Sequence, residues 1–445
     1  MKPYEIPENL LLGTATAATQ IEGGDVNSNW YHWGEAGRIA GDGSPIVAAD
    51  HWNRYDEDIR IMAEHHHQIY RMSIEWSRIE PREGEWSADG IAHYRDEFET
   101  LIRSGIEPLV TLHHFSHPQW LEEKGGWTSR ESVDLFLRFT EKVVEAYGDI
   151  ISEYCTINEP NVFAHDTYIQ NKYPGGKTDD TMSYFRAARN MIRAHLGAYK
   201  LIHTHRANAG HTDTKVGYAI HMAWFEAHRK NPLSRISRAI MDYAFHGMFN
   251  KSMMTGKLPL ILGGGRVKNL HSRGYFSDYI GINYYSRHII KWSWNPAVLF
   301  GSVNVEENLT GEQQNDLGWE LYPPGLYKVS RKLFYQYKLP VFITENGIPD
   351  AEDRKRGKYI IEHLAELKKL IDNGIDVQRY YHWSLLDNME WDDGYGPRFG
   401  LIGINYENQE RIIRRSAELY AAICRNREVS QDMIEEFCKA AVSPS

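Results

Sequence analysis

The sequence predicts an α/β protein: a single (β/α)8 TIM barrel with long insertions in its βα-loops. Three observations predict this fold class. Eight short runs rich in β-branched and aromatic residues recur along the 445 residues, amphipathic helical patterns separate them, and glycines follow two of the helices. Strands that alternate with helices along a whole chain favour a parallel sheet, and eight such units close into a barrel. We therefore expect residues 1–445 to form one domain, with residues from about 426 to 445 as a peripheral tail.

The predicted strands, in chain order, are Leu11–Gln20, Gln68–Trp76, Glu107–Phe115, Glu153–Asn158, Lys215–Met222, Tyr279–Tyr285, Pro340–Glu345 and Val377–Trp383. The predicted helices are Tyr55–His65, Ile91–Ser104, Ser132–Ala146, Thr181–Arg206, Ser234–Thr255, Gly325–Tyr337, Arg356–Asn373 and Arg415–Cys424. Gly105 and Gly374 directly follow two of these helices, where a left-handed residue commonly ends a helix. The longest insertion is expected between Arg287 and Leu321.

An open, doubly wound sheet is the other fold that alternating strands and helices would allow. That fold should carry a glycine-rich fingerprint after its first strand. The glycine cluster Gly263–Gly265 follows no predicted strand and lacks the spacing of a phosphate-binding loop. The barrel is therefore the favoured architecture.

Composition and charge restrict the classes of partner. The formal net charge is −10 and basic residues are scattered, which argues against nucleic acid or an anionic membrane surface. No stretch reaches the roughly 18 apolar residues of a membrane span, and Glu5 and Glu8 precede the apolar run 10–18, where a secretion signal would carry positive charges. The three cysteines show no metal-ligand spacing, which fits a reduced, cytoplasmic compartment. A homo-oligomer stays open.

Polar and aromatic residues gather at the predicted carboxyl ends of the strands. Active sites of such barrels lie at this face, whereas a barrel without a site would carry small polar and turn residues there. The 13 Trp and 27 Tyr of the chain fit either a large core or a sugar site, in which rings stack on the C–H faces of a sugar. The residues at the strand ends are Gln20, Arg71, Glu75, His114, Asn158, Glu159, Asn283, Tyr285, Glu345, Trp383, Glu390 and Trp391.

Two of these carboxylates, Glu159 and Glu345, stand at opposite strand ends. Cleavage of a glycosidic bond needs such a pair, one to protonate the departing oxygen and one to attack the anomeric carbon or activate water. Arg71 and Tyr285 should keep Glu345 ionised, as a nucleophile requires. Glu159 has no obvious cationic partner and can stay protonated, as the acid requires. A rim salt bridge is the alternative for either residue, but it is less favoured for both together.

At this point the motifs resemble those of a known family. Thr156–Pro160 (TINEP) and Ile343–Gly347 (ITENG) are similar to the acid/base and nucleophile motifs of glycoside hydrolase family 1 β-glycosidases of the β-glucosidase type. The resemblance runs from about Ile6 to Cys424. It implies retention of configuration, carboxyl groups about 5–5.5 Å apart, and a glycosyl-enzyme on Glu345 with Glu159 as acid and then base. No metal and no cofactor are expected.

The resemblance also implies a role for each residue around the pair. Gln20 would bind the 3- and 4-hydroxyls of the sugar, His114 the 3-hydroxyl and Asn158 the 2-hydroxyl. Trp383 would stack under the ring, with Glu390 and Trp391 at the 4- and 6-hydroxyls. Arg71, Asn283 and Tyr285 would surround the nucleophile. The substrate is then a small β-glycoside or oligosaccharide: glucosides, with galactosides and fucosides beside them, cleaved from the non-reducing end.

The sequence departs from the family pattern in three places. Phe115 stands where Trp is common, Ser116-His117-Pro118 replaces Asp-Leu-Pro, and His382 precedes the stacking Trp. We expect changes around Phe115 and His382 to influence which sugar is preferred. A subgroup that cleaves 6-phospho-glycosides uses Ser, Lys and Tyr where this chain has Glu390-Trp391, and Arg398 is the only cation nearby in sequence. A carboxylate there would repel a phosphate.

Weaker signals are interpreted without a catalytic role. We expect no metal at His65–His67 and an inert buried thiol at Cys155. Glu75 is an alternative carboxylate, but an ion pair at the barrel wall is favoured for it. Trp292 and Trp294 either stack on the aglycone, which is slightly favoured, or pin the loop. Three alternatives stay open: a transglycosidase with the same residues, a 6-phospho-β-glycosidase, and a silent sugar-binding barrel, which should lack one of the two carboxylates.

Overall fold

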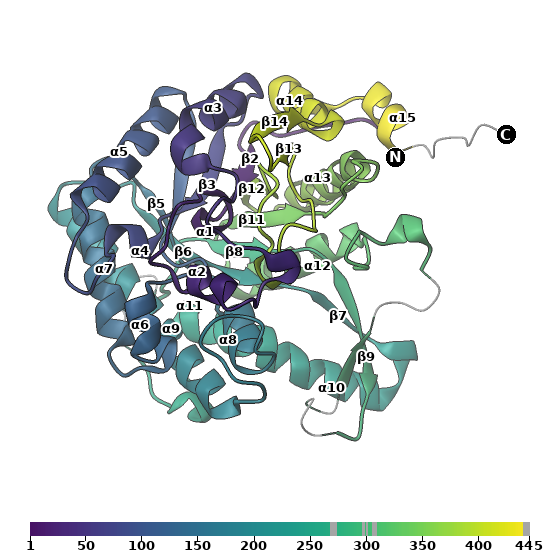
Figure 1. The fold of residues 1–445 in the computed structure, drawn as a ribbon. Helices are drawn as coiled ribbons and strands as arrows, with labels where there is room; N and C mark the ends of the chain where they lie inside the picture. Colours follow the sequence, from purple (N-terminus) through teal and green to yellow (C-terminus); the bar gives the residue numbers. More distant parts are fainter. Residues whose placement is uncertain (268–273, 296–298, 300, 305–308, 439–445) are drawn as a thin grey trace.

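The computed structural model describes residues 1–267, 274–295, 299, 301–304 and 309–438. Eight parallel strands form a closed barrel in the spatial order β11-β12-β2-β3-β4-β5-β6-β8, as Figure 1 shows. They are β2 (Leu11–Ala15), β3 (Ile69–Ser73), β4 (Glu107–Thr111), β5 (Glu153–Asn158), β6 (Lys215–His221), β8 (Ile280–Asn283), β11 (Val341–Gly347) and β12 (Val377–Trp383). The predicted barrel is confirmed, and each strand overlaps one predicted run.

The barrel closes where the last strand pairs with the first. Tyr381 of β12 lies opposite Gly13 of β2, and Gly13 lies opposite Ile69 of β3. A Cβ atom on Gly13 would come within 1.7 Å of the Ile69 carbonyl oxygen. Glycine is therefore required here, because the two backbones approach too closely for any side chain.

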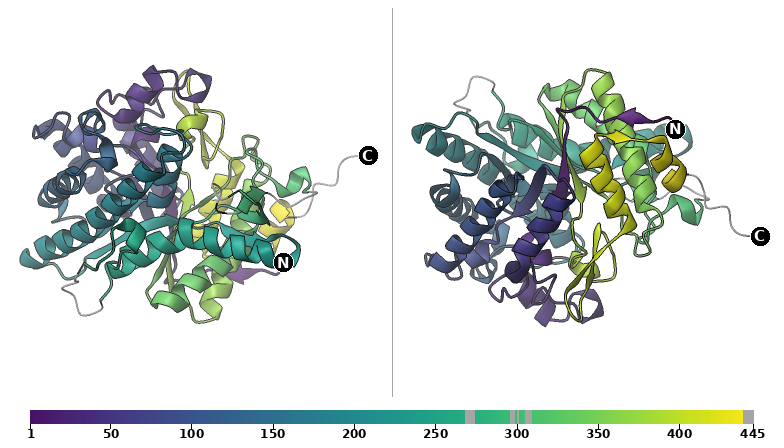
Figure 2. Two further views of the ribbon diagram at one scale, coloured as in Figure 1. Left: turned by 90° about the horizontal axis from the view of Figure 1, so that it is seen from below. Right: turned by 90° about the horizontal axis from the view of Figure 1, so that it is seen from above.

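Helices surround the barrel on its outside (Figures 1 and 2). The longer ones are α3 (His51–Glu64), α5 (Ala88–Arg103), α7 (Ser132–Tyr147), α9 (Thr181–Asn208), α10 (Pro232–Asp242), α11 (Met248–Thr255), α12 (Pro323–Tyr337), α13 (Arg356–Asp372) and α14 (Arg415–Asn426). Most bounds lie close to the predicted ones. The predicted helix Ser234–Thr255 is instead two helices, α10 and α11, with a π-helical segment over Tyr243–Gly247 between them.

Three predicted strands extend too far. β2 ends at Ala15, and Ala18–Ile21 form the short helix α1; β3 ends at Ser73, and Trp76–Ile79 form α4; β4 ends at Thr111, before the predicted end at Phe115. The backbone N–H of Ala18 donates to the Ser73 hydroxyl at 2.8 Å, so a side chain replaces the next strand partner. An apolar run in the sequence does not reveal where a side chain takes over a backbone hydrogen bond and ends the strand.

The segment predicted as the longest insertion forms much of a small second sheet. β9 (Arg287–Trp292) pairs with β10 (Gly301–Asn304) on one side and with β7 (Trp224–Ala227) on the other. In Figure 1 this sheet lies beside α10, away from the barrel strands. It brings two insertions, after β6 and after β8, to one side of the molecule.

The N-terminal strand lies beside the segment that follows α14 (Figure 2). β1 (Tyr4–Glu5) pairs antiparallel with β15 (Glu428–Val429), and the ring of Phe437 in α15 (Gln431–Cys438) packs over Gly357 of α13. Further elements in the loops are α2 (Asn29–Glu35), α6 (Gln119–Glu123), α8 (Pro160–Tyr168) and the hairpin of β13 (Ile402–Asn405) and β14 (Glu410–Ile413). Within the described ranges, no helix has the length and apolar character needed to cross a membrane.

Candidate active site

A cavity of about 290 Å³ lies at the carboxyl ends of the barrel strands. Eight of the eleven predicted site residues line it: His114, Asn158, Glu159, Tyr285, Glu345, Trp383, Glu390 and Trp391. Gln20, Arg71 and Asn283 lie behind this lining and are hydrogen-bonded to it. Residues from strands far apart in sequence therefore meet in one place.

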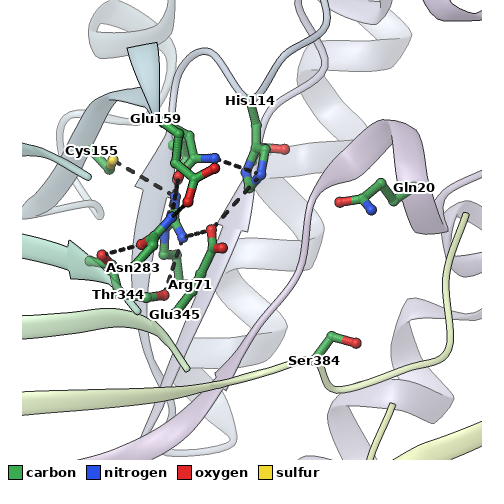
Figure 3. A network of polar contacts seen from close by, with 12 residues as sticks. Gln20, Arg71, His114, Cys155, Glu159, Asn283, Thr344, Glu345 and Ser384 are labelled. Atoms are coloured by element: carbon green, nitrogen blue, oxygen red, sulfur yellow. Dashed lines mark hydrogen bonds and ion pairs between the residues drawn. The ribbon is translucent and has the colours of Figure 1, made fainter. Parts of the chain in front are cut away.

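Glu345, in β11, is held by a cation and a phenol. The Arg71 guanidinium, fully buried in β3, donates from Nη1 to Glu345 Oε1 at 2.5 Å, and the Tyr285 hydroxyl donates to Oε2 at 2.6 Å. Both contacts stabilise the charged carboxylate and fix its orientation. Figure 3 shows Arg71 and Glu345 in contact, with Gln20 apart from them.

Glu159 follows β5 and has a different set of partners. Asn283 Nδ2 donates to its Oε1 at 2.8 Å, and His221 Nδ1 lies 3.3 Å from the same oxygen. The prediction that Glu159 lacks a cationic partner is therefore wrong, because an imidazole that can gain charge stands beside it. Glu159 itself has φ of 40°, in the left-handed region, immediately before Pro160 opens α8. Such strained non-glycine backbone is frequent at functional sites.

Asn158 joins the two carboxyl groups. Its Oδ1 accepts from Arg71 Nη2 at 2.7 Å and from Asn283 Nδ2 at 3.0 Å, and its Nδ2 lies 2.9 Å from His114 Nε2. Because Arg71 also holds Glu345 and Asn283 also holds Glu159, a continuous network fixes the relative position of both acids (Figure 3).

Burial raises the pKa of the Glu345 carboxyl to about 7, against the lowering effect of Arg71 and with a contribution from Glu159 nearby. The hydrogen bonds from Arg71 and Tyr285 oppose the effect of burial and favour the charged form of Glu345.

Gln20 and Glu390 form a second polar group in the site. Gln20 Nε2 donates to the Met389 carbonyl at 2.8 Å, and Glu390 Oε2 lies 3.4 Å from the same nitrogen. Gln20 Oε1 is buried and has no hydrogen-bond partner among the described residues. A buried acceptor without a protein partner next to a cavity is suited to a ligand hydroxyl.

Aromatic rings form one wall of the cavity. His114 stacks on Trp383 and on Trp391, with centroids 5.7 and 5.9 Å apart, and Phe115 lies 5.1 Å from Trp391. Burial, more than the neighbouring Arg71 charge, lowers the pKa of His114 well below its ordinary value, so the ring is neutral. This wall can stack on an apolar ring face while His114 bonds a hydroxyl.

Comparison with known proteins agrees with this arrangement. The family model of glycosyl hydrolase family 1 matches residues 2–429. The chain belongs to this family. It is 32% identical to beta-glucosidase A of Thermotoga maritima, over 96% of this chain and 99% of that protein, and 29% identical to beta-galactosidase of Saccharolobus solfataricus, over 97% of each. The protein is therefore a glycosidase.

Solved structures give the same relationship. A beta-glycosidase from Pyrococcus horikoshii superposes with a TM-score of 0.87 at 32% identity, covering 98% of both chains. The beta-glucosidase from Thermotoga maritima in complex with glucoimidazole gives a TM-score of 0.85 at 30% identity, covering 95% of this chain and 99% of that one.

The residues that depart from the family 1 pattern differ in their position relative to the cavity. Phe115, with φ of 66°, lines the cavity. Ser116 and His117 do not; His117 bonds Glu122 at 2.8 Å beneath the rim. His382 is fully buried, and its ring lies 5.9 Å from the Tyr420 ring of α14. It does not line the cavity, so no contact supports the expectation that it influences the choice of sugar.

Glu75 lies at the barrel wall as expected, but the predicted ion pair is wrong. Ser77 and Ser116 donate to its Oε1 at 3.0 and 2.9 Å, and Thr19 donates to Oε2. In the described part of the chain no cation pairs with it. Burial, with the nearby Asp25 carboxylate, raises the pKa of Glu75, so hydroxyl groups accommodate a carboxyl that no positive charge balances.

Two further expectations concern the insertions. Trp292 and Trp294 contact each other at 5.2 Å, and neither lines the cavity; Trp319 does so instead. Arg398 pairs with Asp387 at 3.4 Å, outside the cavity lining. Lys172 is the cation in the wall, paired with Asp392 at 3.3 Å.

The metal expectation concerns His65–His67, and the thiol expectation concerns Cys155, whose Sγ lies 4.0 Å from Arg71 Nη2. Across the described ranges, no three His, Cys, Asp or Glu side chains converge as metal ligands. Cys155 is buried in β5, and burial raises its pKa, which keeps the thiol protonated and inert.

The sequence did not identify several residues of the cavity wall. His221 is the last residue of β6, so the rule that directs attention to strand ends could have found it. Asp166, Lys172, Phe245, His288 and Trp319 lie in helices, loops and the small sheet, and no strand-end signal marks them.

Proposed function

We propose that the chain is an exo-acting retaining β-glycosidase that hydrolyses terminal, unphosphorylated β-D-glycosides. Glucosides are the expected substrates, with galactosides and fucosides beside them. The observation that carries the proposal is the pair of buried carboxyl groups, Glu159 and Glu345, which face one cavity with different partners. Relatives named as a beta-glucosidase and a beta-galactosidase support the class of sugar.

The first step forms a glycosyl-enzyme. Glu345, charged and oriented by Arg71 and Tyr285, attacks the anomeric carbon as the bond to the leaving oxygen breaks. Glu159 transfers its proton to that oxygen, and the aglycone departs as an alcohol. The network through Asn158 supports this division of labour, because it holds both acids in fixed positions.

The second step releases the sugar. Glu159, now a carboxylate, takes a proton from a water molecule, whose oxygen attacks the anomeric carbon and displaces Glu345. The enzyme regains its starting protonation, and the sugar keeps its configuration.

Charge at the cavity mouth argues against a 6-phospho-glycoside. Asp392 and Asp393 line the cavity, and the nearby Lys172 is already paired with Asp392. A phosphate dianion would meet mainly carboxylates. A transglycosidase would use the same residues, and analysis of products at high substrate concentration separates it from a hydrolase.

The roles of the two acids are tested by removing each one. Glu345→Gly should reduce turnover of aryl β-glucosides by about 10⁴-fold or more, because the nucleophile is lost while stacking and hydrogen bonds remain. Azide should restore part of the activity and give the α-glycosyl azide, measured by NMR of the product. A β-glycosyl azide would mean that the two roles are exchanged.

Glu159→Ala serves as the comparison variant. Its activity should fall by about 10²–10⁴-fold for a poor leaving group and much less for a good one, which needs no protonation. Equal losses for both leaving groups would contradict the assignment of Glu159 as the acid.

A further inference from the structure

We propose that His221 is a positioning residue for Glu159: its imidazole N–H holds one carboxyl oxygen and stabilises the charged form that the second step needs. The inference rests on the proposed function, since it assigns Glu159 as acid and base.

The contact geometry separates the two oxygens of Glu159. Asn283 Nδ2 and His221 Nδ1 both approach Oε1, at 2.8 and 3.3 Å. No described residue bonds Oε2, and the Glu159 side chain is 8% exposed at the cavity. The oxygen that is free of protein partners is therefore the one that can exchange a proton with the leaving group or with water.

The imidazole of His221 is itself held in place. It stacks on the Tyr285 ring with centroids 6.0 Å apart and an angle of 15°, and its edge meets Phe245 at 6.1 Å. Tyr285 in turn donates to Glu345. The stack thus links His221, which contacts Glu159, to Tyr285, which orients Glu345.

Several charged or titratable groups face His221. Glu159 and Glu345 lie on the cavity side, Asp166 on α8, His246 in the π-helical segment and His288 on β9. Burial opposes a charge on the imidazole, but Glu159 and the other carboxylates outweigh it and raise the pKa of His221.

The other two histidines behave differently. Burial lowers the pKa of His288 to about 4, and burial also lowers the pKa of His246. Of the three, His221 is the one whose pKa is raised; the pKa of His246 is lowered although its Nδ1 lies 2.9 Å from Asp242.

The consequence concerns a carboxyl group that must alternate between two states. A hydrogen bond or a positive charge on Oε1 favours the carboxylate over the neutral acid. Glu159 then releases its proton more readily in the first step and remains a carboxylate, able to act as base, in the glycosyl-enzyme. Without His221 the carboxyl keeps its proton to higher pH.

The pH profile of kcat/KM for an aryl β-glucoside with a poor leaving group tests this. His221→Phe keeps a ring to stack on Tyr285 but removes the N–H, and it should move the alkaline limb up by about one pH unit. His221→Asn keeps a neutral N–H donor and should move the limb less. His288→Phe, in the same wall, should leave the limb in place, whatever its effect on KM.

The outcomes are distinguishable. An alkaline limb that stays put in both His221 variants, with circular dichroism and unfolding midpoint unchanged from the parent protein, overturns the inference. A larger shift for Asn than for Phe also overturns it. If the unmodified protein cleaves no glycoside in a nitrophenyl panel, the proposed function fails instead.

Discussion

At the scale of single residues, Glu390 differs from the catalytic pair in its surroundings. Burial, with Asp393, Glu345 and Glu159 nearby, raises its pKa well above the ordinary value, and Gln20 Nε2 lies 3.4 Å away. A carboxyl that keeps its proton can donate one hydrogen bond as well as accept others. Glu390 is therefore equipped to hold a sugar hydroxyl rather than to take part in the chemistry.

Glu390→Ala tests this role. We expect kcat/KM to fall by about tenfold to a hundredfold for glucosides and galactosides, because the hydrogen bonds of the carboxyl group are lost. Fucosides lack the 6-hydroxyl and should lose less, so they are the internal control. The measurement is the ratio of kcat/KM values for nitrophenyl glucoside and fucoside; a ratio equal to that of the parent protein contradicts the contact.

Residue type and position predicted much of the candidate site. Carboxylates, amides and Trp at strand ends converge in any such barrel, so Glu159, Glu345 and Asn158 could be placed together before the structure. The partners of each acid could not, because they depend on distances between strands. Glu75 shows the limit of such predictions. Its partners are hydroxyl groups, and the sequence around Glu75 does not reveal whether its partner is a hydroxyl group or a cation.

At the scale of elements, one ion pair ties the small sheet to the cavity wall. Arg287 opens β9 and bonds Glu320 through two nitrogens, at 2.8 Å from Nε and 2.5 Å from Nη2. Glu320 is 4% exposed and adjoins Trp319, which lines the cavity. The pair therefore fixes the segment that carries Trp319.

Glu320→Gln should loosen this wall. Because Trp319 lies outside the set of residues expected to bind the sugar, we expect it to meet the aglycone. KM for an aryl glucoside should rise about 2- to 12-fold, which corresponds to the loss of one aromatic contact, while KM for methyl glucoside should change little. Glu226→Gln removes the half-exposed partner of Arg287 and is the matched control. An equal rise for both substrates would contradict a role in aglycone binding.

The barrel elements were predictable and the small sheet was not. Alternating strand and helix patterns repeat eight times, so each unit supports the assignment of the others. β9 and β10 occur once, and their pairing with β7 spans a long sequence separation. Local patterns carry no information about such a partner, which is why this insertion was predicted without strands.

At the scale of the whole molecule, a buried network joins early and late parts of the chain. Arg411 of β14 donates to both oxygens of Asp58 in α3, at 2.8 and 2.9 Å. His51 Nδ1 lies 2.7 Å from Asp58, and His51 Nε2 lies 3.0 Å from Glu97 in α5. With His51 charged, two positive groups balance two negative ones away from water.

Asp58→Asn should therefore destabilise the protein without affecting catalysis. Removing one partner leaves a positive charge without its partner in the interior, and we expect the free energy of unfolding to fall by about 3 kcal/mol. Glu64→Gln on the same helix removes an exposed partner of Arg60 and should cost less than about 1 kcal/mol. Urea unfolding followed by tryptophan fluorescence measures both; equal effects contradict the argument.

The pH dependence of the Asp58→Asn effect identifies His51 as part of the network. Burial opposes its charge, but hydrogen bonds to Asp58 and Glu97 raise the pKa of His51 to about 10. The raised folded-state pKa means that this contribution is complete below the unfolded value of about 6.5 and is lost as pH rises toward 10. The difference in unfolding free energy between parent and variant should thus shrink from pH 6.5 to 10, leaving the share that belongs to Arg411. A difference that stays constant over this interval would assign the whole effect to the Arg411–Asp58 pair.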